Sequence, residues 1–133
     1  MGKLVRAISK DASVISMALD ATDIVSEIER IHKTSAVVTA GLGRLTIAGS
    51  LMGYGLKSDE ATVTLRFSGN GATGTLVVVA DNKGNVKSYV QNPIVEIPLN
   101  KFGKLDVAGA VGNQGILAVS KNLGMKEPYI SQV

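Results

Sequence analysis

The sequence predicts an α/β chain of the α+β type, with mixed, mostly antiparallel sheets and two central helices packed on them. Residues 22–32 carry apolar side chains at helical spacing, and residues 35–56 form a long apolar stretch of small residues. Beyond residue 60, short apolar runs alternate with glycine, asparagine and proline, which is typical of strands and turns. With 133 residues, 45% of them apolar, the chain can form a packed core.

A hairpin is predicted to precede the first helix. Two short apolar runs, Leu4–Ser9 and Val14–Asp20, flank a turn candidate and are expected to pair. The helix follows because isoleucines recur at spacings of four and three, with charged residues on the opposite face; these isoleucines are Ile24, Ile28 and Ile31.

The apolar stretch from Ser35 to Leu56 has the length of a membrane span but contains one charge, Arg44. A span is disfavoured because an arginine near its centre costs several kcal/mol and no partner span is present. We therefore predict a long buried helix whose glycines and alanines allow it to lie tightly against a sheet or another helix. A buried Arg44 then needs a carboxylate, and Asp23 and Glu27 on the preceding helix are the candidates.

The second half of the chain is predicted to consist mainly of strands. Alternation predicts the first of them over Ala61–Phe67, and the continuous apolar run Thr75–Ala80 predicts a central strand covered on both faces. The remaining predicted strands are Val86–Gln91, Ile116–Ser120 and Tyr129–Val133. Between them, Asn92-Pro93 ends a strand, Ile94–Pro98 is expected to be short and extended, and the glycine-rich segment 103–115 is expected to form turns.

One glycine-rich segment, Gly69–Gly74, matches the pattern G-x-G-x-x-G. This pattern holds a pyrophosphate when it follows a strand and opens a helix, because the helix supplies N–H donors. Here a predicted strand follows the glycines, so the segment is expected to be a hairpin loop or bulge. A nucleotide-binding enzyme domain that uses Gly69–Gly74 is kept as the alternative function.

No catalytic, cofactor-binding or metal-binding residue is predicted in this chain. It has no cysteine and a single histidine, His32, which cannot supply the three or four ligands of a zinc site. His32 is expected to lie at the end of the first helix and to interact with the helix dipole. The carboxylates form no spaced pair beside a cleft, and no nucleophile-elbow pattern is present. The prediction is therefore a protein that is not an enzyme.

Charge and composition also disfavour a nucleic-acid partner. The net charge is +3 with the basic residues dispersed, and aromatic residues for base stacking amount to 4%. The first eleven residues are charged and contain no apolar run of signal-peptide length. We therefore expect a cytoplasmic protein that binds neither nucleic acid nor a membrane.

Several segments, taken in their order along the chain, resemble a known family. They are Ala21–Val25, Thr39–Arg44, Ser88–Pro93, Gly103–Val107, Ala110–Gly112, Gly115–Val119, Lys121–Gly124 and Pro128–Val133. This ordered set resembles the amino-terminal region of the redox-regulated 33 kDa heat-shock chaperone family, also called the 33 kDa chaperonin. The resemblance extends over nearly the whole chain, and its specificity lies in the order of the segments.

The resemblance implies a redox-regulated holdase that works without ATP and protects unfolding client proteins from aggregation under oxidative and heat stress. It implies a homodimer. Members of the family are more than twice as long and carry a carboxy-terminal redox-switch domain, in which four cysteines in CxC and CxxC pairs bind zinc. Residues 1–133 then correspond to the amino-terminal part of the core domain, which continues past Val133, and zinc belongs only to the full-length family protein.

Overall fold

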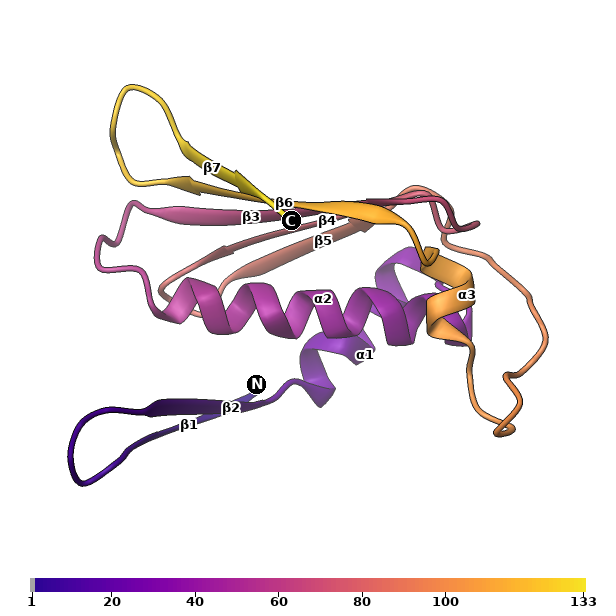
Figure 1. The fold of residues 1–133 in the computed structure, drawn as a ribbon, viewed down its shortest axis with the longest axis horizontal. Coiled ribbons are helices and arrows are strands. Elements are labelled where there is room, and N and C mark those ends of the chain that lie inside the picture. Colours follow the sequence, from indigo (N-terminus) through magenta and orange to yellow (C-terminus); the bar gives the residue numbers. More distant parts are fainter. Residues whose placement is uncertain (1) are drawn as a thin grey trace.

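One long helix lies between a five-stranded sheet and a two-stranded hairpin in the computed structural model, which describes residues 2–133 (Figure 1). The elements are β1 (Lys3–Ile8), β2 (Ile15–Asp20), α1 (Thr22–His32), α2 (Ala36–Tyr54), β3 (Thr62–Gly69), β4 (Thr75–Asp81), β5 (Val86–Val90), α3 (Val107–Val111), β6 (Gly115–Asn122) and β7 (Tyr129–Gln132). The larger sheet has the order β5-β4-β3-β6-β7, and all strand pairs are antiparallel. The predicted α+β class is confirmed.

Helix α2 packs on one face of β3, β4 and β5, and glycines set how closely it approaches. A Cβ atom added at Gly49 would lie 2.7 Å from Cγ1 of Val78, and one added at Gly53 would collide with the carbonyl oxygen of Asp81. Each glycine costs the helix about 1 kcal/mol relative to alanine, so this close packing has to compensate for it. The prediction of a long helix lying tightly against a sheet is confirmed.

Two hydroxyl groups tie α2 to the chain around it. The Ser35 hydroxyl, just before the helix, donates to the carbonyl of Val95 at 2.9 Å and accepts from its N–H at 3.0 Å. The buried Thr46 hydroxyl donates to the carbonyl of Leu42 and shares a hydrogen bond of 2.7 Å with the hydroxyl of Ser88 on β5. The irregular segment after β5 and the edge of the sheet are both held to α2 in this way.

Arg44 was predicted to be buried and paired with Asp23 or Glu27, and this prediction is wrong. Arg44 is exposed, on the part of α2 turned away from the sheet. Glu27 instead accepts hydrogen bonds from Arg30 on its own helix, including one of 2.9 Å from Nε. Arg44 lies on open surface, so it never needed a buried partner.

By length and hydropathy, α2 is the one helix in residues 2–133 that passes the test for a membrane span. Half of its most apolar window is buried inside the protein, and a buried core helix passes the same test. Nine of its residues are buried, including Val38 and Leu42. The helix is therefore accounted for by its packing on the sheet.

Strand β4 was predicted to be covered on both faces, and this is wrong. Leu76, Val78 and Ala80 are buried beneath α2, but Val77 and Val79 on the outer face are only partly covered. Valine suits a pleated, half-buried surface as well as a fully buried one, so the continuous apolar run did not require a second covering layer. The middle strand of the sheet is β3 rather than β4.

The glycine-rich segment 103–115 was predicted to contain only turns, and it contains the short helix α3. The Asp106 carboxylate accepts a hydrogen bond from the Gly109 N–H at 3.0 Å and caps the helix start. Gly112, with φ of 101°, ends it. Of the four glycines in the segment, Gly109 lies inside the helix and Gly112 is its C-cap.

The predicted amino-terminal hairpin is confirmed, with Lys3 opposite Asp20 and Ile8 opposite Ile15. It lies on the side of α2 away from the larger sheet (Figure 1), and Arg6 Nη2 donates to the Tyr54 carbonyl at 3.3 Å. Ile8 and Ile15 are 62% and 68% exposed. This hairpin therefore presents apolar surface that the described residues leave uncovered.

Gly53→Ala is expected to destabilise the chain by about 1–2 kcal/mol, because overpacking against β4 outweighs the helix-propensity gain of about 1 kcal/mol. Gly55→Ala is the matched control, since Gly55 has a right-handed helical φ of −83° and its added Cβ meets only an ordinary contact at 3.4 Å. Urea unfolding of both variants measures the difference. Equal stabilities would show that the helix–sheet distance is not set at Gly53.

Candidate functional site

The loop Gly69–Gly74 joins β3 to β4 and docks on α3. Its backbone N–H groups donate to protein carbonyls: Asn70 to Gln114 at 3.0 Å, Gly71 to Val111 at 3.2 Å, Thr73 to Ala110 at 3.1 Å and Gly74 to Gly71 at 3.2 Å. A Cβ at Gly71 would collide with the carbonyl oxygen of Ala110. The predicted hairpin loop is confirmed, and the donors that a phosphate would need are already used inside the protein. The nucleotide-binding alternative loses its chemical basis.

The residues 2–133 bring together no group of three or more histidine, cysteine, aspartate or glutamate side chains that could hold a metal ion. His32 lies in the last turn of α1, as expected. The described residues therefore contain no set of side chains that could bind the zinc ion implied by the family resemblance.

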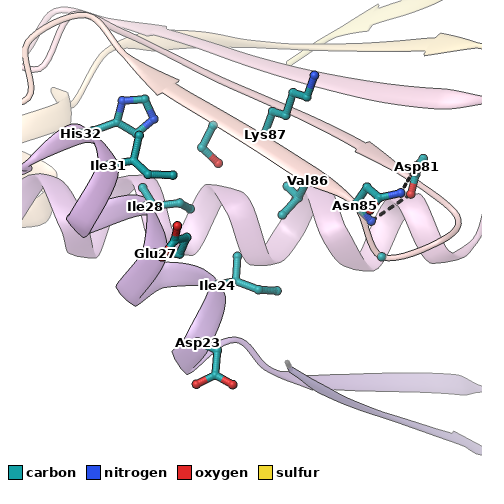
Figure 2. A pocket seen from close by; sticks show the side chains of 12 residues that line it. Asp23, Ile24, Glu27, Ile28, Ile31, His32, Asp81, Asn85, Val86 and Lys87 are labelled. Atoms are coloured by element: carbon teal, nitrogen blue, oxygen red, sulfur yellow. Dashed lines mark hydrogen bonds between the residues drawn. The ribbon is translucent and has the colours of Figure 1, made fainter.

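A groove of about 830 Å³ separates α1 from the edge strand β5. Figure 2 shows Ile24, Ile28 and Ile31 of α1 beside Val86 of β5. These isoleucines share one side of α1 because of their helical spacing, and Ile28 is buried and belongs to the hydrophobic core. The groove thus has an apolar lining made by one helix and one strand.

Carboxylates surround this lining. Asp23 and Glu27 come from α1, as does His32. Asp81 ends β4, and Lys87 lies on β5. Hydrogen bonding from Arg30 lowers the pKa of Glu27 below its usual value. The rim of the groove therefore carries more negative than positive charge at neutral pH.

The turn that closes one end of the groove is built on the Asp81 carboxylate. Asp81 Oδ1 accepts from the N–H of Lys83 at 2.8 Å and of Asn85 at 3.0 Å, and Oδ2 accepts from the Asn85 side chain at 2.8 Å. These bonds, led by the one from the Asn85 side chain, lower the pKa of Asp81. The start of β5 is held in place by this carboxylate.

Sequence reasoning found the isoleucine spacing but missed the groove beside it. The other wall of the groove, β5 and the turn before it, lies more than fifty residues further along the chain. No local pattern in the sequence indicates that α1 packs mainly on α2 and leaves the outer edge of β5 open. The site depends on tertiary placement alone.

Large apolar side chains are also exposed in three other places. They are Val5, Ile8, Val14 and Ile15 on the β1–β2 hairpin, Leu99, Phe102 and Leu105 in the loop before α3, and Leu123, Met125, Tyr129, Ile130 and Val133 around β6 and β7. Both hairpins extend toward the same end of the molecule, on opposite sides of α2 (Figure 1). Exposed apolar surface on this scale is typical of a protein that binds other chains.

Known proteins match this chain over nearly all of its length. Residues 2–133 match the family model described as Hsp33 protein. The chain is 47% identical to a 33 kDa chaperonin of Clostridium beijerinckii and 45% identical to one of Acetivibrio thermocellus, in alignments that cover 98% of this chain and 45% and 44% of those relatives. The crystal structure of a 33 kDa chaperonin from Thermotoga maritima superposes with a TM-score of 0.91 at 37% identity, over 98% of this chain and 44% of that one. The chain spans less than half the length of these relatives.

Acid is expected to loosen the β4–β5 turn. Because folding lowers the pKa of Asp81 from its ordinary value of 3.8, the stabilisation is present above pH 3.8 and is lost as the pH falls through the folded pKa. The protection of the Lys83 and Asn85 amides, relative to an unstructured amide at the same pH, should fall in that range, and Asp81→Asn should remove this pH dependence at the two amides.

The turn of the first hairpin serves as an internal control. The Ser13 N–H donates to Asp11, and hydrogen bonds from Ser13 and Ser9 lower the pKa of Asp11 to about 2. In the Asp81→Asn variant the Ser13 amide should keep its own acid transition. A pH dependence at Lys83 and Asn85 that survives in this variant would show that another group holds the turn.

Proposed function

Because this chain belongs to the Hsp33 family, we propose that it acts in an ATP-independent chaperone that holds unfolding proteins and prevents their aggregation under oxidative and heat stress. The family match over residues 2–133 carries this proposal. Exposed apolar side chains on both hairpins support it, because they offer the surface that unfolded chains bind. The relatives are named chaperonins, which points to binding rather than catalysis as the activity.

Holding an unfolding protein requires apolar contact but no bond chemistry. Burial of apolar surface contributes about 25 cal/mol per Å² and is not directional, so one surface can accept many different clients. Flexible Met125, 73% exposed at the β6–β7 connection, is the kind of side chain that adapts to varied partners. The chemistry of the surface thus fits a holdase with broad client choice.

Redox regulation is part of the proposal, and its switch belongs outside these residues. A thiol switch needs cysteine, and residues 1–133 contain none. The relatives are more than twice as long as the matched region, which leaves room for a zinc-binding switch domain. We place zinc, the disulfides and the remainder of the core domain in that additional length, and we propose a cytoplasmic homodimer as the assembled form.

The 133-residue chain is expected to suppress aggregation of a heat-unfolded client without ATP, as measured by light scattering at equimolar chain and client. The hairpin double variant Ile8→Ser and Ile15→Ser should suppress less, because it removes paired, exposed apolar side chains without touching the core. A client that aggregates at the same rate with and without the chain, or a requirement for ATP, would contradict the proposed function.

Suppression by this chain is expected to be the same after treatment with a thiol-specific oxidant and after treatment with a thiol reductant. The reason is the absence of any sulfhydryl group in residues 1–133. Parallel scattering assays under both conditions measure this. A clear difference between them would mean that redox sensing does not depend on cysteine, and the placement of the switch elsewhere would be wrong.

A further inference from the structure

The edge strand β5 turns unpaired backbone groups toward the groove beside α1. The Asp81 N–H donates to the Asn85 carbonyl at 3.1 Å, and the Gln91 N–H donates to the Thr75 carbonyl at 2.9 Å. Hydrogen-bonded and non-hydrogen-bonded residues alternate along an antiparallel pair. Counting in steps of two from either bond, the backbone N–H and C=O groups of Lys87 and Tyr89 point to β4. Those of Val86 and Ser88 therefore point away from β4, to the open edge of the sheet.

No strand in residues 2–133 pairs with this outer edge, since β5 lies at one end of the strand order β5-β4-β3-β6-β7. Val86 and Ser88 both line the groove, and their side chains point to the face covered by α2. An open strand edge is a template for another extended chain, because such a chain supplies donors and acceptors at the same spacing. The groove therefore combines a backbone template with an apolar lining.

We propose that this groove binds an extended segment of an unfolded client, which adds to the sheet as a strand beside β5. The inference rests on the proposed holdase function and assigns one client-binding site to it. Strand addition takes its affinity from main-chain hydrogen bonds and its selectivity from pockets for alternate side chains. Alternate side chains of the client enter the lining made by Ile24, Ile28 and Ile31.

The charges around the groove define the client segment further. Carboxylates of Asp23, Glu27 and Asp81 stand around the apolar lining, and Lys87 is the one lysine or arginine among the residues that form it. Even with Arg30, the ion-pair partner of Glu27, counted, the negative charges outnumber the positive ones. A segment that alternates apolar with basic residues matches both the lining and the rim, because opposite charges favour its encounter with the groove. The preferred segment is thus apolar and basic in alternation.

The other edge of the sheet, β7, lacks this combination. It is followed by the last described residue, Val133, which is 88% exposed, and no helix lies beside its outer edge in residues 2–133. An edge without a facing helix offers main-chain hydrogen bonds but no lined pocket for side chains. A client segment is therefore expected to bind at β5 rather than at β7, because only β5 has a helix, α1, beside its edge.

Amide hydrogen exchange read by NMR tests strand addition directly. The probe is a peptide about ten residues long that alternates valine and lysine and has blocked ends. On its addition to the wild-type chain, the Val86 and Ser88 amides should gain protection, while the Lys87 and Tyr89 amides, already bonded to β4, should change little. The same peptide with N-methylated valines should produce no protection, because it has no valine N–H to donate to the Val86 and Ser88 carbonyls and its methyl groups block the close approach of the two strands.

Ile31→Ser tests the lining, because Ile31 is 57% exposed and its replacement leaves the core intact. Peptide affinity should fall roughly tenfold, since serine removes an apolar contact without adding a charge. Ile116→Ser is the matched control, because Ile116 is 54% exposed on β6, three strands away from β5. Urea unfolding of both variants establishes that each is folded.

The outcomes separate this inference from the proposed function. Aggregation suppression by the wild-type chain, without new protection at Val86 and Ser88, would overturn strand addition and leave the holdase function standing. If the peptide protects these two amides but the chain suppresses no aggregation, the holdase function is overturned and strand addition stands. Equal affinities of the Ile31→Ser and Ile116→Ser variants for the peptide would also overturn the groove as the site.

Discussion

The contact between α2 and β4 determines where the other elements of this chain can lie. Gly49 and Gly53 bring the helix axis so close to the strand that a single Cβ atom would meet Val78 or the Asp81 backbone. A helix held at this distance covers β3, β4 and β5. Leu117 and Val119 of β6 still pack against the core, whereas β7 has no extensive contact with the helix. The exposed apolar side chains around β7 are therefore a consequence of helix placement, rather than of poor packing.

Most of the fold was predictable because its signals are local. The isoleucine spacing defined α1, the small residues defined α2, and every strand of the final sheet appeared as an apolar run between turns. The errors came from tertiary context. The partner of Arg44, the covering of β4 and the presence of α3 all depend on which face meets which neighbour, and a linear pattern does not contain that information.

The candidate site was less accessible to sequence reasoning than the fold. The loop Gly69–Gly74 carried a recognisable motif but proved to be a packing device against α3, with its N–H groups bound to carbonyls. The groove carried no motif, because an unpaired strand edge is defined by the absence of a neighbour in space. Only the order of strands in the sheet shows that β5 is an edge.

A holdase has to remain folded itself while it exposes surface that attracts unfolded chains, and this chain separates the two requirements by location. The apolar contacts that stabilise it lie between α2 and one face of the sheet, with Val38, Leu42, Leu65 and Val78 almost fully buried. The surfaces that we propose to contact clients lie on elements at the margins, namely the hairpins and the edge strand β5. These margins lie outside the buried core, so the proposed binding would add to the existing structure instead of competing with it. An edge strand suits this task because its backbone groups are satisfied by water when no client is bound and by a client backbone when one is.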